Sequence, residues 1–385
     1  MILDKVLILS VSAGEGHMRA AAAIKQEILQ RNPRAVVTIL DTFRYASPLI
    51  EKMVLGTYME VIKMSPVIYG YFYRQAEKEK PFSGFAKHEF NRIINKLAAP
   101  KLISLIEQMG PQAIVCTHPF PLGILTDLRR REKCSVPIIA AITDFTVHPF
   151  WLFDEVDCYL VAAQSLVKAF TDHGIAVTKI EATGIPIDPD FSSSKDKLIL
   201  RRQWQMDPEL PAVLIMGGGL GMGPLEEVVK DLAASHLPCQ LMVVCGKNEQ
   251  LRNKLSKAHL PGRVHILGYI NNIQELMAAC DIMIGKAGGL SSSEAMASGL
   301  PMFITNPIPG QEERNAEFLE NAGAARLVRD SKDLIQQIKN YLKLPAWQTS
   351  MREAAIRIGS PRSAAAAVDV IQKLVEERNE IEAFQ

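Results

Sequence analysis

The residues best suited to binding a charged ligand lie at 281–299, where a buried strand leads into a glycine pair, three serines and a short helix. The first backbone N–H groups of a helix have no partner within the helix, and glycines let a ligand approach them closely. This arrangement suits a phosphate group. The residues expected to bind there are Gly288, Gly289, Ser291, Ser292, Ser293 and Glu294.

Glu294 has two interpretations. The spacing Ser291-x-x-Glu294 matches a capping box, in which the carboxylate only returns a hydrogen bond to the start of the helix. In the other interpretation Glu294 faces the ligand, which we favour. The polar loop that follows, Pro309-Gly310, contains Gln311 and Glu312, whose amide and carboxylate groups suit sugar hydroxyls. A phosphate site followed by such a loop is what a nucleotide-sugar donor requires.

Four candidates for a general base lie where predicted strands end or in the loops just after them. A group transfer to a hydroxyl needs one base to take the acceptor proton. A single loop histidine is more often a satisfied surface residue, but several that meet in one cleft are harder to dismiss. The candidates are His17, His118, Asp144 and His148.

Other glycine-rich segments raise alternatives. Gly14-Glu15-Gly16-His17 resembles a dinucleotide fingerprint, but Arg19 stands where the third glycine is needed, so nicotinamide binding is disfavoured. Gly16 is instead expected to bind the nucleotide-sugar donor. Gly217, Gly218 and Gly219 begin a loop that runs to Gly223, and it is interpreted either as a flexible diphosphate loop or as a permissive surface turn. Asp188-Pro189-Asp190 spells a D-x-D metal motif but lies in a predicted linker, so we expect no metal.

The elements that position these residues form two series, in each of which predicted strands alternate with segments of helical periodicity. This pattern predicts two doubly wound parallel sheets. Ligands bind at the carboxyl ends of the strands in such folds, so we expect both sheets to face one cleft. We expect one domain at 1–190, with the C-terminal helix 362–385 packed back on it, and a second at 195–361. The predicted strands are 5–10, 36–40, 113–116, 137–142, 157–161, 179–182, 212–216, 240–245, 264–267, 281–284, 301–304 and 325–328.

Composition agrees with a two-domain globular protein. A chain of 385 residues with 48% hydrophobic residues can form two cores, and a net charge of +1 gives no general attraction to nucleic acid. The six cysteines form no C-x-x-C pair, which indicates reduced core residues. No apolar run is long enough to span a bilayer, and the strand at 5–10 leaves no room for a secretory signal. We expect a cytoplasmic protein, soluble or peripheral.

The segment Leu49–Phe90 does not fit a plain α/β unit. An apolar stripe and an aromatic cluster at 66–74 alternate there with lysines, a mixture that is typical of segments that dock at bilayer interfaces. The alternative, which has equal weight, is that these apolar residues pack onto the domain core.

The blocks named above, together with Gly184-Ile185-Pro186-Ile187 and Cys245-Gly246-Lys247-Asn248, resemble the family 28 glycosyltransferases of GT-B fold, in the family's order along the chain. Within that family the likeness is greatest to bacterial diacylglycerol glucosyltransferases and plant monogalactosyldiacylglycerol synthases. The resemblance implies that Glu294 binds the ribose and that Gln311 and Glu312 face the donor sugar. It also implies that the nucleobase lies against the backbone at Tyr269 and Ile270. It also places His17 beside the reacting centre.

The resemblance implies an inverting enzyme that moves glucose or galactose from a UDP-sugar to diacylglycerol at the cytoplasmic membrane face, without cofactor or metal. Three alternatives remain open. The acceptor could be a polyprenyl-linked or other hydrophobic molecule, the chain could be a non-hydrolysing UDP-sugar epimerase, or it could bind nucleotide sugars without turnover.

Overall fold

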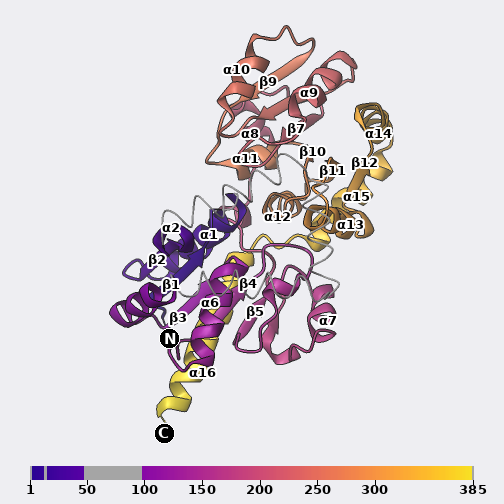
Figure 1. Cartoon of the computed structure of the whole chain (residues 1–385). Coiled ribbons are helices and arrows are strands. Elements are labelled where there is room, and N and C mark those ends of the chain that lie inside the picture. The colour runs from indigo at the N-terminus through magenta and orange to yellow at the C-terminus, as the bar shows by residue number, and fades with distance from the viewer. Residues whose placement is uncertain (1, 13–14, 47–97, 384–385) are drawn as a thin grey trace. The chain divides into compact units, whose positions relative to one another are not determined.

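The protein consists of two compact units, seen in the computed structural model of Figure 1. The first unit comprises Met1–Pro189 and Arg362–Gln385, and the second comprises Asp190–Pro361. The structure describes residues 2–12, 15–46 and 98–383, so the predicted membrane segment Leu49–Phe90 lies outside the described residues.

The first unit is built on a six-stranded sheet in the order β2-β1-β3-β4-β5-β6, with every neighbouring pair parallel. Its central strands are buried on both faces, which explains their uninterrupted apolar sequences. The order reverses between β1 and β3, so their carboxyl ends form a topological switch point. The strands are β1 (Lys5–Ser10), β2 (Val36–Asp41), β3 (Ala113–Cys116), β4 (Ile138–Ala141), β5 (Cys158–Leu160) and β6 (Ile180–Glu181).

Helix α16 (Ser363–Ala383), yellow in Figure 1, belongs to the first unit although it ends the chain. It packs against α1 (Glu15–Arg31), and both helices contribute buried side chains to one core with strands β1, β3 and β4. Arg31 Nη1 contacts Asp369 Oδ1 at 2.6 Å across this helix pair. The other helices of the unit are α2 (Thr42–Ala46), α6 (Pro119–Arg130), α7 (Ser165–Thr171) and the 3-10 turns η1 (Pro149–Trp151) and η2 (Val177–Lys179), and residues 98–109 are also helical.

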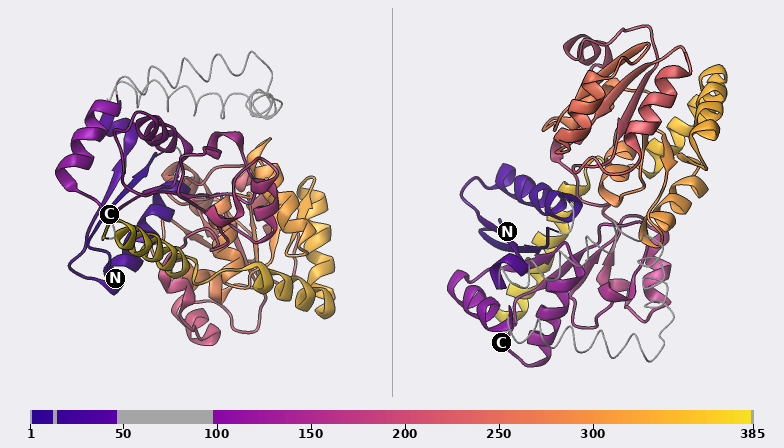
Figure 2. Two further views of the ribbon diagram at one scale, coloured as in Figure 1. Left: turned by 90° about the horizontal axis from the view of Figure 1, so that it is seen from below. Right: turned by 45° about the horizontal axis from the view of Figure 1, so that its top comes forward.

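The second unit repeats this plan, with a parallel sheet in the order β12-β11-β10-β7-β8-β9 and helices around it (Figure 2). Here the switch point lies between β7 and β10. The strands are β7 (Ala212–Met216), β8 (Gln240–Val244), β9 (Arg263–Leu267), β10 (Ile282–Gly285), β11 (Met302–Thr305) and β12 (Ala325–Val328). The helices are η3 (Pro189–Ser192), α8 (Lys197–Gln203), α9 (Leu225–Ala234), α10 (Glu249–Lys257), α11 (Ile273–Ala279), α12 (Gly289–Ala297), α13 (Gln311–Asn321), α14 (Ser331–Lys343) and α15 (Pro345–Ile358).

The predicted α/β fold of two doubly wound parallel sheets is confirmed. All twelve predicted strands are present, and their ends differ from the predicted ends by at most one residue. Helix and strand boundaries commonly vary by this amount because the last residues of an element share its hydrogen bonds with the adjoining loop.

Candidate active site

His17 is held at the carboxyl ends of three strands of the first unit. It lies in the first turn of α1, and its Nδ1 is 2.8 Å from the carbonyl oxygen of Thr117 and 2.9 Å from Oγ1 of Thr143. Thr117 follows β3 and Thr143 follows β4, while Thr117 Oγ1 donates to Ser10 Oγ at the end of β1 (2.9 Å). A carbonyl oxygen only accepts hydrogen bonds, so Nδ1 carries the hydrogen and Nε2 keeps its lone pair. This is the tautomer that a general base requires.

Burial lowers the pKa of His17 below its ordinary value of 6.5, while the charge of Asp144 and the hydrogen bond to the Thr117 carbonyl partly offset that effect. The imidazole is therefore neutral at pH 7 and able to accept a proton. Asp144 is itself buried, with 6% of its surface exposed, and its charge would stabilise the imidazolium that forms when His17 takes a proton.

His118 and His148 have a different hydrogen-bonding pattern. His118 Nδ1 accepts from Phe120 N–H at the start of α6, and His148 Nδ1 accepts from Phe150 N–H at the start of η1, each at 3.2 Å. Both side chains thus cap helix starts, and their remaining nitrogen carries the hydrogen and can only donate. The ring of His118 lies edge-on to that of His17, with centroids 4.5 Å apart. Burial lowers the pKa of His118 well below its ordinary value, and the charge of His17 lowers it further.

The four predicted catalytic candidates therefore differ in what they can do. His17 has the lone pair of a base, Asp144 has a charge that acts on His17, and His118 and His148 can donate hydrogen bonds. Gly16 precedes His17 as the second residue of α1. Sequence reasoning assigned no role to Thr117 or Thr143, because two contacts that span 100 and 126 residues leave no mark in local spacing.

In the second unit the glycine loop that follows β7 is a closely packed turn. Met222 N–H donates to Gly217 O at 3.0 Å, and Lys247 N–H, from the turn after β8, donates to Gly219 O at 2.9 Å. A Cβ on Gly217 would lie 2.1 Å from Met222 O, and one on Gly246 would lie 2.4 Å from Gly219 O. Close approach of the two backbones requires these glycines, so the loop is not simply a permissive surface turn, and its role as a diphosphate loop stays a prediction. Gly218, with a φ of +68°, remains half-buried.

Helix α12 begins at Gly289 and has Gly288 as its N-cap. Glu294 is thus six residues into the helix, too far along to return a hydrogen bond to the cap, and the capping-box interpretation of Ser291 and Glu294 is wrong. A Cβ on Gly288 would meet no atom within 4 Å, so the helix start has open space. Ser291 is half-buried, whereas Ser292, Ser293 and Glu294 are buried.

Helix α13 fastens the loop between β10 and α12. Glu312 Oε1 contacts Lys286 Nζ at 2.8 Å, and its Oε2 accepts from Ile308 N–H at 2.8 Å. The buried Asn315 donates from Nδ2 to the carbonyl of Ala287 at 3.0 Å. Gln311 is the first residue of the helix and is half-buried. At the start of α13, Glu313 Oε2 accepts from Gly310 N–H at 2.9 Å, which is the glutamate half of a capping box.

Tyr269 and Ile270 follow β9, and Tyr269 is 42% exposed. Lys247 Nζ lies 5.3 Å from the centre of the Tyr269 ring, which is a cation–π distance. The carboxyl end of the second sheet therefore brings together the glycine loop, the start of α12, the start of α13 and this tyrosine, as the nucleotide prediction requires.

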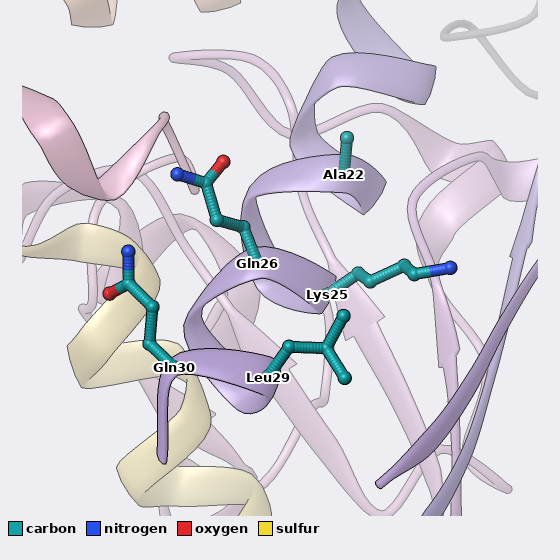
Figure 3. Close-up of a pocket in the computed structure, with 5 residues that line it drawn as sticks. All are labelled: Ala22, Lys25, Gln26, Leu29 and Gln30. Carbon is teal, nitrogen blue, oxygen red and sulfur yellow. The ribbon is translucent and has the colours of Figure 1, made fainter. Parts of the chain in front are cut away.

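Two surface hollows are present, and one of them includes part of the glycine loop. One of about 400 Å³ lies along α1 and is lined by Ala22, Lys25, Gln26, Leu29 and Gln30, with no histidine or carboxylate among them (Figure 3). The other, of about 510 Å³, is lined by Gly221 and Gly223 of the glycine loop and by the start of α9, where Glu226, Glu227 and Asp231 outnumber Lys230. Among residues 2–12, 15–46 and 98–383, no group of three or more histidines, cysteines or carboxylates is placed to hold a metal ion.

The chain resembles curated relatives along nearly its whole length. It is 32% identical over 376 residues to the processive diacylglycerol beta-glucosyltransferase of Bacillus cytotoxicus, with 95% of this chain and 93% of the relative covered. It is 31% identical over 340 residues to the enzyme of the same name from Bacillus licheniformis, with 88% and 86% covered. Residues 17–187 match the monogalactosyldiacylglycerol (MGDG) synthase family, and residues 212–372 match the glycosyltransferase family 28 C-terminal domain. This chain belongs to glycosyltransferase family 28.

The family 28 assignment agrees with solved structures of the same fold. MurG of Acinetobacter baumannii is 17% identical, with a TM-score of 0.59 and 96% of this chain and 99% of that chain covered. Alr3699/HepE of Anabaena, solved in complex with UDP, is 15% identical, with a TM-score of 0.54 and 99% and 100% covered. At these identities the likeness shows the GT-B fold alone, and the predicted GT-B class is confirmed.

As a member of family 28, the chain is a glycosyltransferase. The match at 17–187 lies in the first unit, and the match at 212–372 covers most of the second unit and continues into α16 of the first. In the part of the chain that the structure describes, no helix has the length and apolar character needed to cross a bilayer. One further side chain of the second unit was missed in the sequence analysis. Lys286 stands directly after β10 and two residues before Gly288, which was a usable signal.

Proposed function

We propose that this glycosyltransferase transfers glucose from UDP-glucose to diacylglycerol, with inversion at the sugar carbon. The observation that carries the chemistry is the His17 imidazole, whose Nδ1 faces the Thr117 carbonyl and whose Nε2 is left as a base. That base would take the proton of the acceptor hydroxyl as it attacks the sugar. The relatives' names support the acceptor and the choice of glucose over galactose.

The donor side of the proposal rests on the second unit. The open start of α12 at Gly288 and the neighbouring backbone N–H groups suit the diphosphate of UDP, which leaves as the sugar is transferred. The backbone beyond β9 at Tyr269 would bind the uracil ring of UDP. Glu294 and Gln311 would bind hydroxyl groups of the ribose and the sugar. We propose that UDP binds there without a divalent metal.

An assay of UDP release with diacylglycerol liposomes tests this function. Purified protein is expected to release UDP from UDP-glucose only when diacylglycerol is present, and to form a glucosyl lipid that mass spectrometry detects. UDP-galactose is the comparison donor, and it tests the choice of glucose. In a separate calorimetric titration, adding a chelator should leave the affinity for UDP unchanged, because no metal is required. Interconversion of sugars without UDP release would identify an epimerase instead, and UDP binding without either reaction would identify a non-catalytic protein.

The proposal also places the enzyme peripherally on the cytoplasmic face of the membrane, through Leu49–Phe90. The sequence supports this, because an apolar and aromatic segment carries Arg74, Lys78 and Lys80 in a chain of almost zero net charge. Each basic residue near an anionic surface contributes about 1 kcal/mol of binding, and buried aromatic side chains add a part that salt does not weaken.

Replacing Tyr71, Phe72 and Phe85 with serine is expected to reduce co-sedimentation with anionic liposomes and lipid glucosylation together, while UDP affinity stays intact. Val177→Ser provides the matched control, because it removes an apolar side chain that is 61% exposed elsewhere in the first unit. If the triple variant instead melts at a lower temperature and still sediments with liposomes, those side chains belong to the domain core and the membrane proposal fails.

A further inference from the structure

Lys286 is the first residue after β10, at the switch point of the second sheet where β10 adjoins β7. The strand ends are in close contact there, since a Cβ on Gly285 would lie 2.6 Å from Met216 O. The Lys286 side chain passes the glycine loop, with its Cδ 3.8 Å from the position of a Cβ on Gly223, and ends 2.8 Å from Glu312 Oε1. It therefore connects the loop after β7 to the start of α13.

The ion pair of Lys286 and Glu312 is shielded from water, with 17% and 14% of the two side chains exposed. The second carboxylate oxygen of Glu312 accepts from Ile308 N–H, so the carboxylate is held at both ends. An ammonium group has three N–H donors, and among the residues described the structure shows one of them used, by Glu312. A cation with donors to spare thus lies two residues before the open start of α12.

We propose that Lys286 supplies the cation that binds the donor's diphosphate, and that Glu312 is a positioning residue that holds the ammonium in place. This inference rests on the proposed function and names a part of the donor site that the resemblance did not assign. It also changes the part expected of Glu312, from binding sugar hydroxyls to fixing Lys286. Glucosyl transfer breaks the bond between the sugar carbon and the diphosphate oxygen, and the electron pair of that bond stays on UDP. A fixed ammonium stabilises the negative charge that collects there.

The ligand series UDP, UMP and uridine separates a phosphate contact from a nucleoside contact. Lys286→Met keeps an unbranched side chain as long as the aliphatic part of lysine and removes the ammonium group. Calorimetry is expected to show UDP affinity reduced at least about tenfold, which is what the loss of a charge-assisted hydrogen bond produces, with uridine affinity unchanged. The dependence of UDP affinity on salt should also weaken, whereas Lys286→Arg should retain most of the affinity.

A double variant distinguishes attraction by Lys286 from repulsion by Glu312. In Lys286→Met the carboxylate of Glu312 loses its partner and could itself repel the diphosphate. Lys286→Met with Glu312→Gln removes both charges, and the glutamine oxygen can still accept from Ile308 N–H. The proposal requires the double variant to bind UDP as weakly as Lys286→Met. Recovery of native UDP affinity would overturn the proposal, because Lys286 would then only neutralise Glu312.

Glu312→Gln alone tests the positioning role. If Glu312 fixes the ammonium, this variant lowers the affinities for UDP and UDP-glucose by the same factor. If Glu312 contacts the sugar, the variant lowers the affinity for UDP-glucose alone, which would overturn that part of the proposal. Thermal melting identifies any variant that is misfolded. If Lys286→Met is misfolded, Lys286→Arg tests the proposal in its place, because its UDP affinity should keep the salt dependence of the unmodified protein. If the unmodified protein binds UDP and Lys286→Met binds it equally well, the inference about Lys286 is refuted and the proposed function is not. Failure of the unmodified protein to bind UDP refutes the proposed function instead.

Discussion

Replacing His17 with alanine is expected to lower turnover by about 100-fold or more, with little change in UDP affinity. The imidazole is the one candidate whose hydrogen bond, from Nδ1–H to the Thr117 carbonyl at 2.8 Å, leaves a nitrogen lone pair for the acceptor proton. Apart from Gly16, the residues expected to bind UDP belong to the other unit, so the loss should fall on kcat. Initial rates with UDP-glucose and diacylglycerol liposomes measure it, beside calorimetry with UDP.

The matched control is His173→Ala, which removes an exposed histidine of the same unit. Asp144→Asn should also lower turnover about 100-fold, because it removes the charge that stabilises protonated His17. Near-normal turnover in both His17→Ala and Asp144→Asn would show that the catalytic base lies elsewhere.

The pH dependence of kcat/KM follows from the same geometry. A base works when deprotonated, and burial lowers the pKa of His17, so the fall of kcat/KM on the acid side should lie below pH 6.5. The charge of Asp144 raises the pKa of His17, so any residual activity of Asp144→Asn should show that fall shifted further toward acid pH. If Asp144→Asn does not shift the acid-side fall of kcat/KM, a group other than His17 controls that part of the pH profile.

The strands of both sheets could be predicted closely because each central strand is buried on both faces. Strands such as Val6–Leu9 and Val213–Ile215 therefore appear as continuous apolar runs, and a β-branched run between helical segments has few other interpretations. The carboxyl ends of these strands carry the functional groups in such folds, so the neighbourhood of His17, His118 and Asp144 also followed from the sequence.

The roles of individual side chains were harder to predict. Glu294 matches a capping box in spacing, but the helix begins at Gly289 and the match has no structural meaning. The loop at 217–223 contains glycines because two backbones meet there, a reason that depends on a turn after another strand. Glu312 was predicted from its chemistry and from the family resemblance, and its two hydrogen-bonding partners, Lys286 and Ile308, became visible only in the folded structure.

Replacing Asp281 with alanine is expected to destabilise the second unit by about 3–5 kcal/mol. The carboxylate lies at the amino ends of β7 and β10, where it accepts from Arg201 Nη2 at 2.6 Å, Lys197 Nζ at 2.5 Å and Ala212 N–H at 2.7 Å. The Arg201 side chain is only 7% exposed, so removal of the carboxylate leaves a shielded guanidinium without its countercharge. Such a loss is a large fraction of the 5–15 kcal/mol that stabilises a typical domain.

A second variant separates the loss of an attraction from the exposure of an unpaired charge. Arg201→Met combined with Asp281→Leu removes both charges and fills the space with apolar groups, an exchange that is often neutral at buried ion pairs. Urea unfolding should therefore show a large loss of stability for Asp281→Ala and a much smaller loss for the double variant. Because the cluster lies at the opposite end of the sheet from the glycine loop and α12, Asp281→Ala should bind UDP normally well below its melting temperature. Equal losses in the two variants would show that Asp281 stabilises the unit through its bond to the Ala212 N–H, at the first residue of β7, and not through Arg201.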